Sequence, residues 1–397
     1  MALLEYLVIL PIGTYLIFNS LYLFVSAAAG WFGGKDDAST TRLPVRIRRI
    51  AVLVPAYKED KVILDSVQAN LQQTYPSDSY DIYVIADSFR PETLQQLSHF
   101  RVNVLVVSFE QSTVQKSLTK ALELLPQGVY DIVLVSDADN HMAPDFLHRV
   151  NLAFDSGWRA VQGHRVAKNT NTSVAVFDAM NEEVNNHLFR KGQRALGFSA
   201  SLIGSGMAFE PDTMKRAMGQ IRSVGGYDKE LEMLLLTEGI RIAYLNDALI
   251  YDEKVQNLEV FEHQRARWIA AQIHFVKLYF GTGIRQLLRG NLHAFNGLVK
   301  GFLIPRILYL ALLSFGTFLG LVLGLQPVFQ FFGLLLAMLI FTLLTSTPGY
   351  LWKKISIRDL LTLPVLIFRM IRSLLKVKTA SKKFMHTPHG ETVVKEN

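Results

Sequence analysis

The chain has 397 residues, half of which are hydrophobic, and it carries a formal net charge of +7. It has no cysteine, which excludes disulfide bonds and thiolate metal sites. No nucleic-acid-binding motif is present, so we assign the positive charge to contacts with anionic lipid headgroups rather than with nucleic acid.

The longest apolar runs lie near the two ends of the chain. In the run Leu3–Gly30 only Glu5 is charged, and the run is long enough to cross a bilayer, so we predict a transmembrane helix over residues 1–30. The run is too long for a cleaved signal peptide and lacks its basic start. Two further transmembrane helices are predicted over residues 296–325 and 327–347, and an amphipathic helix lying in the membrane interface over residues 355–376.

Basic residues next to these spans predict an orientation. A basic linker over residues 31–48 follows the first span, and Lys353, Lys354 and Arg358 follow the third. Short loops rich in Lys and Arg stay on the cytoplasmic side. We therefore expect a multi-pass protein of the inner cell membrane with its N-terminus outside. The middle of the chain and the tail, residues 377–397, are then cytoplasmic.

The middle of the chain, residues 49–290, alternates apolar runs with helical patterns. Strands are predicted over residues 50–54, 82–86, 102–107 and 132–135. A helical pattern over residues 115–125 separates the last two of them. Such alternation is typical of the α/β class, with a doubly wound, mostly parallel sheet.

Polar side chains follow three of these strands. Asp137 and Asp139 come directly after the fourth strand, and residues two apart at a strand end can converge on one hard cation. From these two residues alone, a solvated acidic turn is the alternative. Tyr57 and Glu59 follow the first strand, and Asp87 ends the second. Because ligands bind at the carboxyl ends of the strands in an open α/β sheet, we predict a nucleotide site at this edge.

Two later motifs could contact a substrate. The segment Gly204-Ser205-Gly206 forms a small-residue turn whose glycines let the backbone approach a ligand, although an ordinary β-turn explains it equally well. Gln264, Arg267 and Trp268 share one face of a predicted helix. A guanidinium suits a diphosphate and an indole offers a flat face to a sugar ring. Taken alone, an amphipathic surface helix with an interfacial tryptophan would explain the second motif.

Between about Arg49 and Trp268 the chain resembles membrane-integrated family 2 glycosyltransferases of the cellulose synthase and hyaluronan synthase type. The resemblance rests on Val54-Pro55-Ala56-Tyr57-Lys58-Glu59-Asp60, Val84-Ile85-Ala86-Asp87-Ser88, Lys116-Ser117-Leu118-Thr119-Lys120-Ala121-Leu122, Asp137-Ala138-Asp139 and Gln264-Arg265-Ala266-Arg267-Trp268. In the tail, Phe384-Met385-His386-Thr387-Pro388-His389 loosely resembles the gating loop of cellulose synthases, from which the two histidines depart.

The resemblance implies a GT-A fold and a role for each matching residue. It implies nucleotide binding by Pro55, Ala56, Tyr57, Glu59, Asp87, Lys116, Asp137 and Arg267, acceptor binding by Gly204, Ser205, Gly206, Gln264 and Trp268, and Mg²⁺ or Mn²⁺ binding by Asp137 and Asp139. Counting back from Gly239 places Asp228 at the family's catalytic base and Glu230 at its second acid. The chain has Tyr227 where the family usually has a glutamate.

The implied activity is inverting transfer of a sugar from a UDP-sugar to a hydroxyl of a growing polysaccharide or lipid-linked glycan. One carboxylate base is sufficient for inversion, whereas retention requires a positioned nucleophile as well. Two alternatives remain: transfer of one sugar to a lipid carrier or glycolipid, and a non-catalytic membrane scaffold that keeps a nucleotide-binding domain. Three spans make a thin wall for a polymer channel, so a homo-oligomer or an export partner would be needed to complete one.

Overall fold

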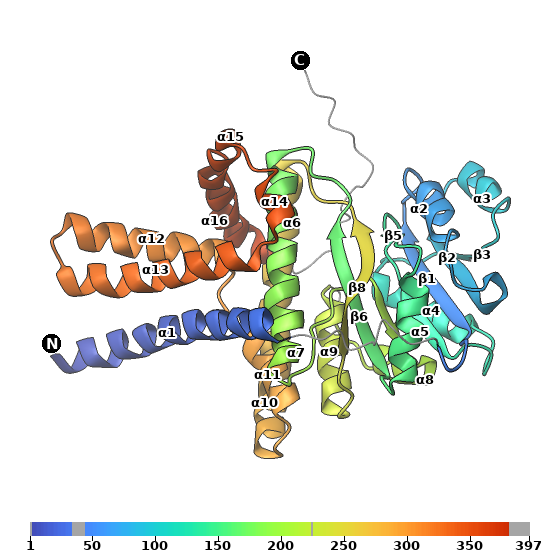
Figure 1. The fold of residues 1–397 in the computed structure, drawn as a ribbon, viewed down its shortest axis with the longest axis horizontal. Helices are drawn as coiled ribbons and strands as arrows, with labels where there is room; N and C mark the ends of the chain where they lie inside the picture. Colours follow the sequence, from blue (N-terminus) through green and yellow to red (C-terminus); the bar gives the residue numbers. More distant parts are fainter. Residues whose placement is uncertain (1, 34–43, 224, 381–397) are drawn as a thin grey trace.

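The computed structural model describes residues 2–33, 44–223 and 225–380, and an eight-stranded sheet forms its centre (Figure 1). The strands are β1 (Ile50–Tyr57), β2 (Tyr80–Asp87), β3 (Asn103–Val107), β4 (Ile132–Val135), β5 (His141–Met142), β6 (Ala160–Ala167), β7 (Met207–Phe209) and β8 (Ala243–Asp252). Their order in the sheet is β3-β2-β1-β4-β7-β6-β8-β5. β1 to β4 pair in parallel, β7 runs antiparallel between β4 and β6, β8 is parallel to β6, and β5 is antiparallel to β8.

Helices cover both faces of this sheet, because the side chains of each buried strand alternate between two apolar layers. Val52 and Val54 of β1 face the layer that contains α2 (Ile63–Asn70), α3 (Pro91–Leu97) and α5 (Phe146–Asp155). Ala51 and Leu53 face the layer that contains α4 (Val114–Leu124), α8 (Pro211–Met218) and α9 (Tyr227–Thr237). The predicted α/β class and mostly parallel sheet are confirmed.

The chain after β6 adds a helical layer between the sheet and the apolar helices (Figure 1). α6 (Ser173–Asn185) continues through a π-helical segment, η2 (Asn186–Gly192), into α7 (Gln193–Ala195). α10 (Leu258–Leu288) has 31 residues, and α16 (Leu363–Ala380) packs along it. Three further helices are short: η1 (Ser77–Ser79), α14 (Gly349–Trp352) and α15 (Ile357–Leu360).

Three apolar helices project side by side from this layer, away from the sheet (Figure 1). They are α1 (Ala2–Phe32), α12 (Arg306–Val322) and α13 (Gln326–Ser346). By length and composition, two described helices are able to cross a membrane, α1 over Ile9–Phe32 and α13. A third span is present if α11 (Leu292–Gly301) and α12, which are bent by 60° at their break, count as one. These apolar helices indicate membrane association.

Two predicted membrane segments look different in the structure. The helix expected over residues 296–325 is broken between α11 and α12, where Pro305 lacks an N–H donor and disfavours helical geometry in the residue before it. In α16, which covers most of the predicted interface helix, Leu366 and Met370 are buried while Phe368 and Leu375 are exposed. The exposed apolar side is compatible with a membrane interface, which remains a prediction. The predicted gating loop lies outside the described residues.

Candidate active site

A cavity of about 690 Å³ lies between the carboxyl edge of the sheet and the helical layer. Of the residues selected from the sequence, those lining it are Pro55, Tyr57, Glu59, Asp137, Asp139, Gly204, Asp228, Gln264, Arg267 and Trp268. From the sheet edge the cavity continues past α9 and α10 to the start of α12. One space therefore connects the strand ends to the apolar helices.

The strand ends at this edge are shaped by two backbone turns. Lys58 after β1 and Ser88 after β2 both have positive φ angles, 57° and 62°, and the Lys58 N–H donates to the carbonyl of Asp87. Asp87 pairs with Tyr57 across the two strands and is buried. Its Oδ2 has no hydrogen-bond partner among the described residues, so a ligand at this edge could supply the missing donor. Ala56 is buried within β1 and does not line the cavity.

The sequence places Lys116 at a diphosphate, but the structure points its side chain elsewhere. Its Nζ donates to the carbonyl of Gln111 at 2.8 Å, and the residue is exposed outside the cavity wall. The cavity is instead lined by Val114 and Gln115 from the same helix. Thr113 caps α4 by accepting from the Lys116 N–H.

Asp137 and Asp139 are held at the end of β4 by hydrogen bonds from other segments. The Asp137 N–H donates to the Ser205 hydroxyl at 3.0 Å, and that hydroxyl donates to the side-chain oxygen of Asn140 at 2.7 Å. Oδ2 of Asp139 accepts the Glu253 N–H at 3.1 Å. Ser205 is expected to contact the acceptor. In the structure it is fully buried, does not line the cavity, and stabilises the loop that carries Asp137 and Asp139.

The two aspartates suit a divalent metal that is shared with a substrate. Both carboxylates line one cavity, and oxygen ligands are those preferred by Mg²⁺ and Mn²⁺. Within the described ranges, no three Asp, Glu, His or Cys side chains are grouped so as to hold a metal. Mg²⁺ in proteins is commonly bound by one or two carboxylates together with substrate phosphates. The donor set therefore fits a metal that completes its coordination on a diphosphate.

The glycine turn before β7 requires its glycines. Gly204 and Gly206 have φ angles of +87° and +66°, and a Cβ on Gly206 would approach Ile250 to 2.7 Å. The Tyr227 hydroxyl donates to the carbonyl of Gly204 at 2.9 Å. Gly204 lines the cavity whereas Gly206 does not. Tyr227, the departure from the family pattern, therefore fixes the turn that faces the cavity.

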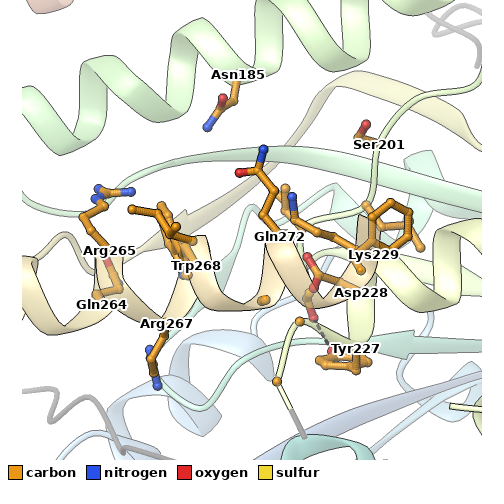
Figure 2. Close-up of a pocket in the computed structure, with 18 of the residues that line it drawn as sticks. Asn185, Ser201, Tyr227, Asp228, Lys229, Gln264, Arg265, Arg267, Trp268 and Gln272 are labelled. Carbon is orange, nitrogen blue, oxygen red and sulfur yellow. Dashed lines mark hydrogen bonds between the residues drawn. The ribbon is translucent and has the colours of Figure 1, made fainter. Parts of the chain in front are cut away.

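Asp228 lies in the first turn of α9 and faces the cavity (Figure 2). Gly226 precedes the helix with φ +73°, and a Cβ there would lie 2.9 Å from Ala271 of α10, so the helix starts tight against α10. Burial raises the pKa of Asp228 above its ordinary value of 3.8, although Lys229 opposes the shift. A carboxylate with a raised pKa is a better proton acceptor near neutral pH, as a general base requires.

Glu230, two residues further on, has a structural environment. It is buried and accepts the backbone N–H groups of Arg222 and Ser223 at 3.1 and 2.9 Å. It also accepts the hydroxyl of Tyr279 from α10 at 2.8 Å, and it does not line the cavity. These bonds tie α9 to α10, so that Asp228, and not Glu230, is the carboxylate of this helix turn that lines the cavity.

The motif on α10 presents side chains on two sides of the helix. Figure 2 shows Arg267 on the side opposite to Arg265 and Gln272. Arg265 forms an ion pair with Asp178, and its guanidinium lies 4.0 Å from the centre of the Trp268 ring. Trp268 is 37% exposed and lines the cavity. On the other side of the helix, burial lowers the pKa of Arg267. Arg265 thus fixes the indole in place.

The model of the family described as "Glycosyltransferase like family 2" matches residues 48–271, more than half of the chain. The chain belongs to this family. The matched residues include the whole edge of the sheet, Asp228 and the α10 motif, so the predicted glycosyltransferase family is confirmed and the chain is a family 2 glycosyltransferase.

Curated relatives with glycosyltransferase names agree with the family assignment. The chain is 25% identical over 229 residues to the probable glycosyltransferase YdaM of Bacillus subtilis, covering 55% of this chain and 54% of that protein. It is 25% identical over 236 residues to the beta-monoglucosyldiacylglycerol synthase of Synechocystis, covering 58% and 48%. The chain spans about half the length of the curated relatives it matches.

The mannosyltransferase PcManGT from Pyrobaculum calidifontis was solved in complex with GDP-Man and Mn²⁺. It matches with a TM-score of 0.50 and 18% identity, covering 83% of this chain and 98% of that one. This likeness concerns the fold, and it confirms that the sheet is of the GT-A type.

Several supporting residues of this glycosyltransferase were not selected from the sequence. Asp178, which holds Arg265, lies 87 residues away on α6, and no local pattern marks it. Arg165 and Glu182 form a buried ion pair of 2.8 Å in the cavity wall. The one usable signal was Arg265, which stands inside the α10 motif beside the residues that were selected.

Proposed function

We propose that this family 2 enzyme is an inverting, metal-dependent hexosyltransferase at the cytoplasmic face of the membrane. It moves a sugar from a UDP-sugar to a hydroxyl of a growing polysaccharide or lipid-linked glycan. The observation that carries the proposal is that one cavity is lined by the aspartate pair, by Asp228 and by Arg267. A direct displacement needs a donor site and a proton acceptor within one shared space.

The donor is held at the carboxyl edge of the sheet. Asp87 is assigned to the nucleoside because its buried Oδ2 lacks a donor. Asp137 and Asp139 would hold Mg²⁺ or Mn²⁺, and the bound ion would neutralise charge on the diphosphate of the leaving UDP. Arg267 adds a guanidinium whose planar donors match a diphosphate, and its desolvated position strengthens that contact. Lys116 would have to leave the Gln111 carbonyl to share this task.

Asp228 performs the acid–base step. It accepts the proton of the acceptor hydroxyl as the hydroxyl oxygen attacks the anomeric carbon and the bond from that carbon to UDP breaks. The raised pKa of Asp228 makes this transfer more favourable near neutral pH. Since Glu230 is engaged by three donors, a single carboxylate serves the reacting centre, which is the arrangement for inversion.

The acceptor approaches along α10, where the Trp268 indole offers a face to a sugar ring and the Gly204 turn borders the cavity. The cavity continues to the break between α11 and α12. Because it reaches the apolar helices, single addition to a lipid acceptor is a second candidate. A polymer product would require a homo-oligomer or an export partner to complete a channel.

Turnover of a panel of UDP-sugars by detergent-purified protein tests this function, with the product sized by mass spectrometry. We expect one UDP-sugar to be consumed in the presence of Mg²⁺ or Mn²⁺. A ladder of products indicates polymer synthesis, and a single added sugar indicates the second candidate. UDP binding without turnover of any donor would instead support the scaffold alternative.

A further inference from the structure

In the cavity wall, buried guanidinium donors of Arg165, Arg265 and Arg306 have no acceptor among the described residues, and Arg306 lies at the end next to the apolar helices. Arg306, the first residue of α12, donates through Nη2 to the backbone and side-chain oxygens of Asn181, at 3.2 and 2.6 Å. Its Nη1 is buried and has no partner among the described residues, and the same holds for Nε of Arg265. Both arginines line the cavity. Buried donors are rarely left unsatisfied, so each such atom calls for an explanation.

The charges around these donors leave an excess of positive charge. The ion pairs around these donors include Arg265 with Asp178, Lys300 with Glu232 at 2.6 Å, Arg165 with Glu182 at 2.8 Å, and Lys254 with Asp252 at 2.6 Å. Arg190 shares Glu182 at 3.6 Å. In the part of the chain that the structure describes, no carboxylate lies within ion-pair distance of Arg306. Arg306 therefore has no counter-ion within ion-pair distance among the described residues, and its only hydrogen-bond acceptors there are the oxygens of Asn181.

An anionic ligand bound at Arg306 would supply the missing counter-charge. A charge buried without a partner is costly, and the cost rises next to a membrane, where water is scarce. A guanidinium N–H such as that of Nη1 donates a strong, charge-assisted hydrogen bond to a phosphate oxygen. The first turn of α12 also lines the cavity, and the N-terminus of a 17-residue helix adds a favourable potential for an anion. A neutral glycan or a diacylglycerol carries no negative charge that could pair with Arg306.

We propose that this end of the cavity binds a phosphate group of the acceptor, so that the acceptor is an anionic lipid carrying both a phosphate and a free hydroxyl. The proposal rests on the proposed function and specifies its acceptor. The phosphate is held at Arg306 and is not transferred. The hydroxyl oxygen forms the new bond to the anomeric carbon, its proton passes to Asp228, and UDP leaves with the electrons of the broken bond.

Two matched pairs of acceptors test the proposal and separate the two sources of such a phosphate. Dioctanoyl phosphatidylglycerol is compared with dioctanoylglycerol, and decyl-diphospho-N-acetylglucosamine with decyl N-acetylglucosaminide. The full chain in detergent micelles is used, first for equilibrium binding without a sugar donor and then for turnover. We expect the charged member of one pair to bind about ten- to a hundred-fold more tightly, the contribution of one charge-assisted contact. The pair that shows this preference identifies the source.

Substitution of Arg306 then tests whether this residue causes the preference for the charged acceptor. Arg306→Gln should bring the ratio of charged to neutral affinity close to one, through a rise in Kd and KM for the charged acceptor, while Arg306→Lys should keep part of it. The control is Arg216→Gln, which removes an exposed arginine that pairs with Glu238 outside the cavity and should keep the full ratio. Thermal unfolding in the presence of UDP checks that each variant is folded, and the Lys variant retains the charge should the Gln variant fail to fold.

Three results would overturn the proposal. The neutral members could bind as tightly as the charged ones, Arg306→Gln could weaken both members equally, or Arg306→Gln could weaken UDP binding, which would place Arg306 at the donor. The binding measurements keep the two proposals separate. If charged lipids bind through Arg306 but no UDP-sugar is turned over with any acceptor, the phosphate site stands and the proposed function fails. If sugar is transferred readily to the neutral acceptors and Arg306→Gln has no effect, the proposed function stands and the phosphate site fails.

Discussion

Asp228→Asn is the substitution that tests the mechanism most directly. Asparagine keeps the shape of the side chain but cannot accept a proton at neutral pH. General-base catalysis contributes about a hundred- to ten-thousand-fold, so kcat should fall by roughly that factor. The Kd of UDP should stay close to that of the wild type, because the proposed donor contacts lie at the sheet edge and on Arg267. Initial rates with saturating UDP-sugar and isothermal titration with UDP measure the two quantities.

The raised pKa of Asp228 adds a second readout, with a defined sign. The base works deprotonated, so wild-type kcat should fall as the pH is lowered through a pKa above 3.8. The folded state also holds the proton more tightly than the unfolded state does, so ionised Asp228 destabilises the fold at pH values above 3.8. Asp228→Asn should therefore melt at a higher temperature than the wild type at pH 7. The difference should disappear as the pH falls below the unfolded pKa.

Glu230→Gln is the matched control. Glu230 accepts two backbone N–H groups and one hydroxyl away from the cavity, so its substitution should lower the melting temperature and leave most of kcat. An inactive, folded Glu230→Gln variant combined with an active Asp228→Asn variant would refute the assignment of the base. Full activity of both variants would move the base outside α9.

The other predictions concern the metal, the indole support, the glycine turn and the membrane topology. Asp139→Asn should abolish turnover, and its UDP affinity should be the same with Mn²⁺ as with EDTA, whereas full wild-type activity in excess EDTA would remove the metal role. Arg265→Met should lower stability by about 3–5 kcal/mol in thermal unfolding, because it leaves Asp178 buried without its partner. Tyr227→Phe removes the bond to the Gly204 carbonyl and should cost about 0.5–1.5 kcal/mol, with a rise in acceptor KM. In sealed right-side-out vesicles a tag before Met1 should be accessible to antibody and a tag after Asn397 protected, and the opposite pattern would invert the orientation.

The parts of the fold that could be predicted from sequence are those determined by local patterns. The fourth strand was predicted over 132–135, where the structure has it, because a continuous apolar run bounded by polar residues has few other solutions. Strand ends were less accurate, since β1 continues through Pro55 to Tyr57. Polar residues directly after strands could be selected for the same reason, because a parallel sheet brings its carboxyl ends to one edge.

The supporting interactions of the site could not be predicted, because they join segments far apart in the chain. Glu230 looked like an acid of the site, yet its partners Arg222 and Tyr279 lie on a preceding loop and on α10. Ser205 likewise accepts a hydrogen bond from the loop after β4, 68 residues earlier, and no local sequence pattern indicates this contact. Lys116 matched a motif, but the direction of a long flexible side chain depends on the loop that precedes its helix.

The geometry of α10 explains why its motif combines these residues at this spacing. Each residue of an α-helix is rotated by about 100° from the previous one, so Arg265 and Arg267 project from nearly opposite sides, as Figure 2 shows. Trp268 follows Arg265 by three residues, which places the indole against that guanidinium at 4.0 Å. A single rigid helix thus presents one arginine toward the donor edge and another, with its indole, toward the membrane end. In the proposed mechanism, the helix therefore fixes the position of Arg267 at the donor relative to Trp268 at the acceptor, whereas the metal-binding aspartates depend on the loop after β4.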